Sequence, residues 1–193
     1  MTYSFKQYLT QYAGVTASQF EQLEDKIEKR SLTEGKVLLS EGQVCHHFFY
    51  VEKGLLRFYS IDKRGREHIL QFAPEKWLVV DRASFYSNEP SEFYIDTLEA
   101  SRIAVLDEPF IDMASELSPQ FRKYNERILQ NHIRQLQKRI GRLIGTSAEE
   151  RYLNFVEKYK DVVSRVPQWM IASYLGITPE SLSRIRKTLA NQA

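Results

Sequence analysis

The chain has 193 residues, of which 42% are hydrophobic and 27% are charged, and its formal net charge at pH 7 is +2. This length and composition are typical of a globular protein with one or two domains, each large enough to bury a core. The single cysteine, Cys45, excludes an internal disulfide and any cluster held by several cysteines of one chain. No apolar run is long enough to span a bilayer and no signal peptide is evident, so we expect a cytoplasmic protein without membrane contact.

The charge is distributed unevenly along the chain. Residues 1–117 carry 13 Lys and Arg against 19 Asp and Glu, whereas residues 118–193 carry 14 against 6. The two parts therefore have net charges of −6 and +8. A basic end is typical of a segment that binds nucleic acid, although a basic face can also be merely solvated.

The first 30 residues have the spacing of helices. Phe5, Tyr8 and Leu9 fall on one face of a first helix. Thr16 and Gln19 have the spacing of a capping box, which predicts the start of a second helix.

From Ser31 to about Leu106 the pattern changes to short apolar runs separated by turn residues. Runs spaced about 8–12 residues apart, with glycine turns between them, predict an antiparallel barrel or roll. Asp62–Gly65 is predicted to be a hairpin turn. The predicted strands cover 37–39, 48–51, 55–59, 68–72, 77–80, 93–95 and 103–106.

A long helix without internal proline is predicted from Pro119 to Gly145. Five aliphatic residues on it follow a heptad spacing: Leu129, Ile133, Leu136, Ile140 and Leu143. This stripe could pack on the roll, but a helix of this length extends beyond what a small roll can cover. We therefore predict that the five residues form a dimer interface, in which the helices of two chains pair in parallel.

A shorter helix is predicted over residues 148–159, with Thr146 or Ser147 as its cap. Its spacing predicts three inward-facing residues: Tyr152, Leu153 and Val156.

Residues 167–189 have the features of a helix-turn-helix. Gly176 suits a sharp turn with positive φ, and Ala172 leaves room for a second helix to cross close above it. Thr178 and Pro179 suit the N-cap and the first position of that second helix. The apolar residues expected between the helices are Ile171, Leu175, Ile177, Leu182 and Ile185. A purely structural hairpin is the alternative, but turn, cap and packing signals agree on a helix-turn-helix.

The order of an N-terminal antiparallel β-roll, a long heptad helix and a C-terminal helix-turn-helix resembles the Crp–Fnr family of bacterial transcription regulators. The resemblance covers nearly the whole chain and is carried by residues 51–59, 147–153 and 174–184. It implies an α+β fold in three parts. These are a β-roll domain over 1–117 that resembles cyclic-nucleotide-binding domains, a dimerisation helix over 118–145 and a DNA-binding domain over 146–193.

The resemblance also implies a homodimer that binds a two-fold-symmetric site on double-stranded DNA, with RNA polymerase as a further expected partner. The positions that match the base-reading residues of the family are Glu180, Ser183 and Arg184. Arginine can donate two hydrogen bonds to guanine, glutamate can accept one from cytosine, and serine can serve either base. This combination resembles the Fnr branch and implies half-sites similar to TTGAT.

Five other residues near the turn are expected to contact DNA phosphates: Gln168, Thr178, Ser181, Arg186 and Lys187. Many relatives continue into a β-hairpin wing after the second helix. The sequence given stops at Ala193, and we expect no such wing.

The roll of this family often binds cyclic AMP through a Gly–Glu pair and an Arg–Ser or Arg–Thr step. The positions that resemble these hold Val79–Val80 and Ser91–Glu92, so the ribose partner and the phosphate cation are both replaced. The carboxylate of Glu92 would repel a phosphodiester, and Arg82 is the nearest cation that could substitute. We therefore predict a degenerate pocket that does not bind a cyclic nucleotide, and the effector stays unknown.

No metal, cofactor or enzymatic activity is predicted. Cys45, His46 and His47 are consecutive, and only the first and last of three adjacent strand residues can converge. Catalytic metal sites in rolls need two or three histidines and a carboxylate, and no His-x-His spacing occurs here. The remaining alternative is a ligand-binding roll whose helix-turn-helix contacts protein instead of DNA.

Overall fold

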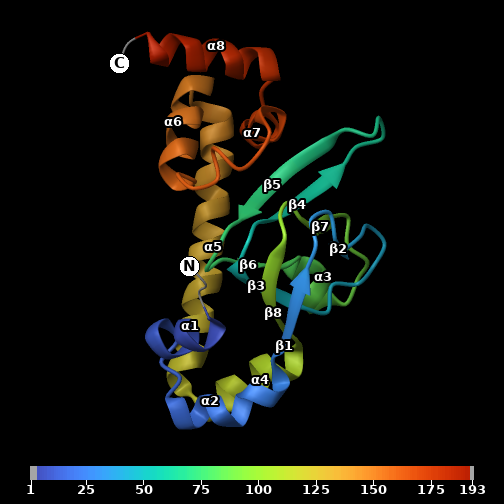
Figure 1. Ribbon diagram of the computed structural model, residues 1–193, viewed down its shortest axis with the longest axis vertical. Coiled ribbons are helices and arrows are strands. Elements are labelled where there is room, and N and C mark those ends of the chain that lie inside the picture. Colours follow the sequence, from blue (N-terminus) through green and yellow to red (C-terminus); the bar gives the residue numbers. More distant parts are fainter. Residues whose placement is uncertain (1–3, 192–193) are drawn as a thin grey trace.

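The long helix forms one side of the molecule, and the β-roll lies against it (Figure 1). The structure is a computed structural model that describes residues 4–191. The N-terminal helices cover one end of the roll, and the C-terminal helices cover the other (Figure 1).

The chain begins with two short helices, α1 (Phe5–Tyr12) and α2 (Ala17–Leu23), followed by a 3₁₀ turn, η1 (Glu24–Lys26). The predicted capping box is confirmed: Thr16 Oγ1 accepts from the Gln19 amide, and the Gln19 side chain accepts from the Thr16 amide. Both helices pack with α4 (Glu108–Leu117) around an aromatic cluster. The buried rings of this cluster include Phe5, Phe20, Phe48, Phe110 and Phe121.

The roll consists of two four-stranded sheets in which every pair of strands is antiparallel, as predicted. One sheet has the order β1-β8-β3-β6 and the other β2-β7-β4-β5. The strands are β1 (Glu28–Leu32), β2 (Val37–Leu39), β3 (Phe48–Lys53), β4 (Leu56–Ile61), β5 (Glu67–Ala73), β6 (Leu78–Val79), β7 (Tyr94–Thr97) and β8 (Ser101–Leu106).

Two elements of the roll differ from the prediction. Residues 28–30 belong to β1, which pairs with β8, so the helical prediction for them is wrong. This strand has no fully buried side chain, and its sequence therefore carries no apolar run. A one-and-a-half-turn helix, α3 (Arg82–Ser87), interrupts the roll where no element was expected. Asp81 caps it by accepting from two backbone amides.

A buried ion-pair network fixes the second sheet. Arg57 donates from Nε to Asp96 at 2.8 Å and from Nη1 to Glu67, and the Tyr59 hydroxyl donates to Asp96 at 3.1 Å. Burial alone would lower the pKa of Arg57, but the hydrogen bonds to the two carboxylates raise it above its ordinary range. The network therefore holds β4, β5 and β7 in one register.

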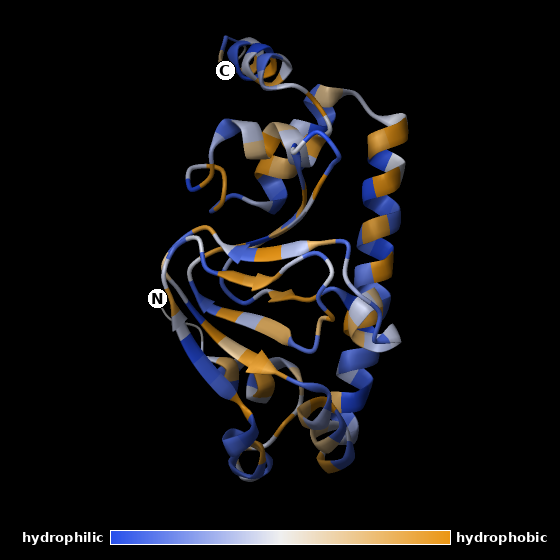
Figure 2. Ribbon diagram, turned by 90° about the vertical axis from the view of Figure 1, so that its right-hand side faces the viewer, coloured by the Kyte–Doolittle hydropathy of each residue, from blue (hydrophilic) through white to orange (hydrophobic). Residues whose placement is uncertain are grey.

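The helix α5 runs from Pro119 to Gly145, as predicted, between an N-cap at Ser118 and a C-cap at Thr146. Apolar bands recur along it (Figure 2). The five heptad residues are 36–57% exposed, and Ile144 beside them is 83% exposed. The alternative that this stripe packs on the roll is therefore wrong, and the stripe faces solvent in the single chain.

Three helices follow: α6 (Ala148–Lys158), α7 (Gln168–Leu175) and α8 (Pro179–Ala190). Ser147 and Glu150 form a capping box at the start of α6. Tyr152 faces inward, as predicted. Leu153 is 49% exposed, so the prediction that it faces inward is wrong. The buried ring next to Tyr152, one helical turn along, is that of Phe155. Together, α6 and α7 share one apolar cluster with the roll, which includes Leu55, Ile69 and Phe72 of the roll and Phe155, Tyr159, Ile171 and Leu175 of the C-terminal part.

Candidate nucleic-acid interface

The turn between α7 and α8 has the geometry that the sequence predicts. Gly176 ends α7 with φ +67°, and its amide donates to the carbonyls of Ala172 and Ser173. Thr178 is the N-cap of α8, since its Oγ1 accepts from the Ser181 amide at 3.2 Å, and Pro179 takes the first helical position. The local sequence therefore fixes the entry angle of α8.

The space between α7 and α8 is filled by the predicted apolar residues. Ile171, Ala172, Leu175 and Leu182 are each at most 2% exposed, and Ile177 and Ile185 pack against the same cluster. Full burial of one aliphatic side chain stabilises by about 1.5–3 kcal/mol. The wedge thus holds α8 as a rigid unit with its polar side outward.

The three predicted base-reading residues lie together on the free side of α8. Glu180, Ser183 and Arg184 are all exposed, and their spacing of three and four residues places them on one helical face. This helix lies at the end of the molecule, away from the roll (Figure 1). The face is therefore open to a partner along its length.

The electrostatics of this face suit hydrogen bonding to bases. The pKa of Glu180 is lowered by its own backbone amide, by the Thr178 hydroxyl and by the charge of Arg184. Glu180 is thus ionised at neutral pH and can only accept hydrogen bonds. Arg184 carries the complementary donors one turn further along.

Ser181, one of the predicted phosphate contacts, is hydrogen-bonded within the helix-turn-helix itself, and its contact with DNA stays a prediction. Its Oγ accepts from Arg184 Nη2 at 3.1 Å and from the Thr178 hydroxyl at 3.3 Å. The side chains of Ser181 and Thr178 are therefore engaged with the cap and with Arg184. The sequence could have indicated the contact between Ser181 and Arg184, because side chains three residues apart meet on a helix surface. Of the other predicted phosphate contacts, Gln168, Arg186 and Lys187 are exposed.

Hydrogen bonds attach the helix-turn-helix to an edge strand of the roll. Ser173 Oγ accepts from the Ile69 amide at 3.0 Å and donates to the Glu67 carbonyl at 2.9 Å, so α7 pairs with β5. Arg139 of α5 donates to the carbonyls of Ile69, Leu70 and Tyr174. The roll, the long helix and α7 therefore meet at one point.

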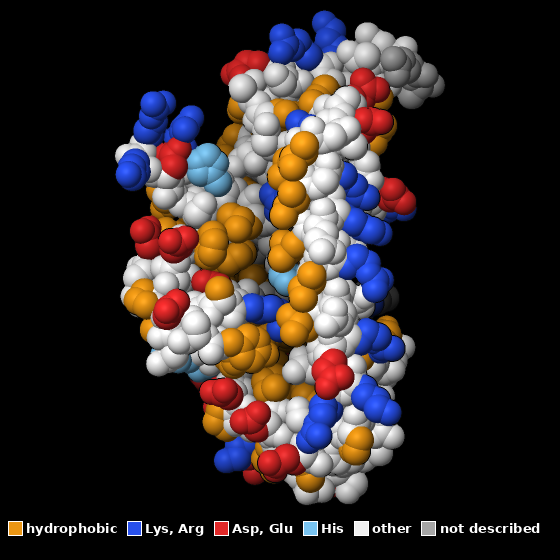
Figure 3. Space-filling view, turned by 180° about the vertical axis from the view of Figure 1, so that it is seen from behind, with side chains coloured by type: hydrophobic (Ala, Val, Ile, Leu, Met, Phe, Trp, Pro, Cys, Tyr) orange, Lys and Arg blue, Asp and Glu red, His pale blue; other side chains and the backbone are white. Residues whose placement is uncertain are grey.

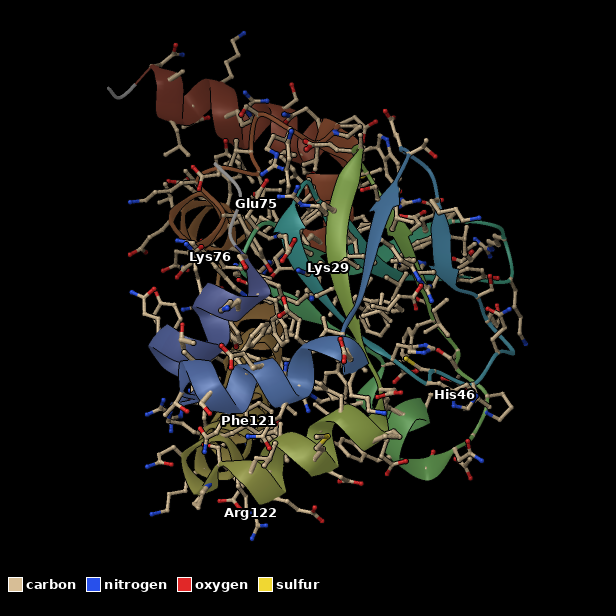
Figure 4. All side chains as sticks on the ribbon, turned by 60° about the horizontal axis from the view of Figure 1, so that its bottom comes forward. Lys29, His46, Glu75, Lys76, Phe121 and Arg122 are labelled. Atoms are coloured by element: carbon tan, nitrogen blue, oxygen red, sulfur yellow. The ribbon has the colours of Figure 1, made fainter. Side chains whose placement is uncertain are left out.

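A second attachment lies between the roll and the segment after α6. Arg165 donates to Glu99 at 2.8 Å and to Glu75 at 3.0 Å. Hydrogen bonds to Glu99 and then to Glu75 raise the pKa of Arg165 above its ordinary range, against the effect of burial. Glu75 lies where the roll faces the C-terminal helices (Figure 4).

Of the residues of the predicted degenerate pocket, Val80 and Arg82 line one cavity beside the long helix, and the other three do not. Val79 is buried in the core between the sheets, and Ser91 is buried with its hydroxyl donating to Asp81 at 2.7 Å. Glu92 is exposed. Arg82 cannot replace the missing cation there, because its guanidinium lies 5.1 Å from the centre of the Phe48 ring, on the side of α5.

Within residues 4–191, no three His, Cys, Asp or Glu side chains are grouped so that they could hold a metal ion. Cys45 is buried, and its thiol donates to the His47 carbonyl at 3.5 Å. Each helix in the same range is too short or too polar to serve as a membrane span.

The chain is similar to known regulators along most of its length. A family model for the cyclic nucleotide-binding domain matches residues 29–115. The transcriptional activator protein FnrA of Stutzerimonas stutzeri is 30% identical over 178 residues, which is 84% of this chain and 71% of that protein. The transcriptional activator protein anr of Pseudomonas aeruginosa is 25% identical over 187 residues, which is 89% of this chain and 75% of that protein.

Solved structures show the same fold. FixK2 from Bradyrhizobium japonicum superposes with a TM-score of 0.74 at 17% identity, covering 86% of this chain and 85% of that chain. The c-di-GMP responsive global regulator CLP of Xanthomonas campestris superposes with a TM-score of 0.72 at 15% identity, covering 92% of this chain and 93% of that chain.

Proposed function

This chain belongs to the Crp–Fnr family of transcription regulators, and from that premise we propose that it binds a two-fold-symmetric DNA site as a homodimer. The observation that carries the proposal is the exposed face of α8, on which Glu180, Ser183 and Arg184 lie together. A capped helix held by a buried wedge is the arrangement that enters a major groove. Such a protein acts in the cytoplasm, where bacterial DNA lies, and RNA polymerase is its expected partner there.

Base readout follows from the donors and acceptors on this face. Arg184 donates to O6 and N7 of guanine, and Glu180 accepts from the N4 amine of cytosine. Ser181 restricts the guanidinium through its hydrogen bond to Arg184, so fewer side-chain rotamers are lost on binding. The exposed cations Arg186 and Lys187 contact phosphates and supply the salt-dependent part of the affinity.

The exposed stripe on α5 supports the dimer. Leu129, Ile133, Leu136, Ile140 and Leu143 form a continuous apolar line beside basic side chains (Figure 3). A line of this kind is costly to leave in water and pairs with a second copy in a coiled coil. Parallel pairing puts two α8 helices at the same end, where they reach half-sites about 34 Å apart.

We also propose that cyclic AMP is not the effector. The Ser91 hydroxyl is engaged with Asp81, and Arg82 points out of the roll toward α5. The roll therefore presents no cation for a cyclic phosphate at the matched positions. Isothermal titration calorimetry with cyclic AMP and cyclic GMP should give no heat of binding up to about 1 mM, and micromolar binding would overturn this part.

Fluorescence anisotropy with labelled fragments of the host genome tests DNA binding. The proposal predicts that a minority of fragments bind far more tightly than the rest and that this binding weakens steeply with salt. Absence of binding to every fragment, at low and at physiological salt, would contradict it. That result would favour a helix-turn-helix that contacts protein.

A further inference from the structure

The hairpin between β4 and β5 projects from the roll toward the end of the molecule that carries α7 and α8 (Figure 1). Its predicted turn at Asp62–Gly65 is confirmed, since the Gly65 amide donates to the Asp62 carbonyl at 2.9 Å. Gly65 takes φ +74°, where any other L-residue would be strained. The tip is therefore a defined turn at the free end of two paired strands.

Basic side chains gather at this tip. Lys63 and Arg64 are exposed, and the side chains of Arg66 and His68 are 64% and 51% exposed. Seen from behind, Lys and Arg side chains form a projecting group on this side of the molecule (Figure 3). Within residues 4–191, neither Lys63 nor Arg64 forms an ion pair, so both cations are available to a partner.

The carboxylate at the tip is already engaged. Asp62 accepts from the amides of Arg64 and Arg66 at 2.9 and 3.0 Å, and it pairs with the Arg66 side chain at 2.7 Å. Hydrogen bonds from the Arg66 amide and from the side chains of His68 and Arg66 hold the pKa of Asp62 below its ordinary range. Asp62 therefore shapes the turn and pairs with Arg66, and it leaves Lys63 and Arg64 unpaired.

This cluster differs in sign from the domain that carries it. Residues 1–117 have a net charge of −6, whereas residues 63–66 hold three cations and no carboxylate. A run of like charges on a projecting turn gives a local positive potential even on an acidic domain. The tip is thus the part of the roll that suits a polyanion.

The hairpin is fixed relative to the helix-turn-helix. Ser173 of α7 accepts from the Ile69 amide at 3.0 Å and donates to the Glu67 carbonyl at 2.9 Å. The Glu67 carboxylate in turn pairs with Arg57 of β4. Arg64 lies three residues beyond Glu67, and a strand advances about 3.3 Å per residue, so the tip lies roughly 10 Å past this attachment. The cations of the tip and the readout face of α8 therefore belong to one frame.

We propose that the tip of the β4–β5 hairpin contacts the DNA backbone outside the half-site that α8 occupies, with Lys63 and Arg64 against phosphates. This inference rests on the proposed function. The tip projects away from α5 (Figure 1), so in a dimer that pairs along α5 each tip lies at the outer margin. Duplex DNA carries one negative charge per about 1.7 Å and continues past each half-site there.

Such contacts carry no sequence information, but they fix the register of the protein and add to its affinity. The roll then takes part in DNA binding directly, in addition to supporting α7 and α8.

Binding to duplexes of two lengths tests this role. The sequence that the full wild-type chain selects from a random pool is made as a core duplex, which spans the two half-sites, and as a long duplex with about 20 bp, or two helical turns, added at each end. The wild type should bind the long duplex at least about tenfold more tightly than the core at about 0.1 M salt. Lys63→Gln/Arg64→Gln should lose this advantage and match the wild type on the core duplex.

The salt dependence gives a second readout. Two contacts per chain make four in the dimer, so the slope of log K against log salt on the long duplex should fall by about 3 to 4 in this variant. Lys29→Gln/Lys53→Gln is the matched control, because it removes the same charge from exposed positions on the other sheet of the roll. The control should leave the slope unchanged, and an equal fall would assign the effect to net charge and overturn the proposal.

Directed cleavage locates the contact. An iron–EDTA reagent attached at Lys63→Cys should cut the long duplex in both flanks, outside the half-sites. The native Cys45 is buried, and burial raises the pKa of its thiol, so it reacts slowly with the reagent. Lys29→Cys, labelled in the same way, should leave the flanks uncut.

The outcomes separate this proposal from the proposed function. Equal affinities and slopes for Lys63→Gln/Arg64→Gln and the wild type on the long duplex, or uncut flanks, would overturn the hairpin contact while the core duplex is still bound. A wild-type chain that retains no duplex would overturn both. Sedimentation equilibrium should show the same oligomer for variant and wild type, and dissociation of the variant alone would assign the tip to the partner subunit and overturn the contact with DNA.

Discussion

Substitution of Ile140 by glutamate should separate the two chains of the proposed dimer. Ile140 is 57% exposed in the single chain, and full burial of an isoleucine stabilises by about 1.5–3 kcal/mol, so the remaining burial contributes roughly 1–1.7 kcal/mol per chain. In a symmetric dimer this contribution is lost in both chains, and the variant also places two carboxylates in the apolar interface. We expect a total cost of about 4 kcal/mol or more, which corresponds to a dimer dissociation constant about 1000-fold higher.

Sedimentation equilibrium at several concentrations measures this directly. Glutamate is at least as good a helix former as isoleucine, so α5 itself should persist in the variant. Leu153→Glu is the matched control, because Leu153 is 49% exposed but lies on α6, outside the stripe. The reasoning is refuted if Ile140→Glu stays dimeric, or if Leu153→Glu dissociates equally.

Three further results are expected. Arg184→Ala should weaken binding to the preferred site by about 1–3 kcal/mol and relax its sequence preference, whereas equal loss on random DNA would make Arg184 a phosphate contact. Arg57→Met should lower the free energy of unfolding in urea by about 3–5 kcal/mol, because the buried Asp96 loses its partner; a loss under about 1 kcal/mol would contradict the role of the network. Because the folded chain holds the pKa of His132 below its ordinary value, protonation favours the unfolded state, and stability should fall as the pH drops below about 6.5. That part of the decrease should vanish in His132→Gln, and persistence in the variant would assign it to other groups.

The sequence predicts the C-terminal part closely because its signals are local. Gly176, Thr178 and Pro179 determine the turn and the cap through contacts with their immediate neighbours. The bounds of α5 were predicted from an uninterrupted helical spacing without internal proline, and the structure caps the helix with Ser118 and Thr146. Capping and turn chemistry do not depend on distant parts of the chain, so they can be read without the fold.

The features that the sequence missed depend on distant partners. Strand β1 exists because Glu28–Leu32 pairs with β8, and its own residues carry little apolar signal. Arg82 was expected near a pocket of the roll, yet the cap at Asp81 starts α3 there and directs the guanidinium toward α5. Leu78 of β6, His132 of α5 and Lys158 of α6 line one cavity, and no spacing in the sequence indicates such a convergence.

The most direct test of the central claim is selection of bound duplexes from a pool of random sequences, followed by sequencing of those retained by the wild-type protein. Two copies of α8 at one end of a parallel dimer predict an enriched motif of two inverted half-sites, with centres about one helical turn apart. An enriched single half-site without symmetry, or a retained pool no different from the starting pool, would contradict the account.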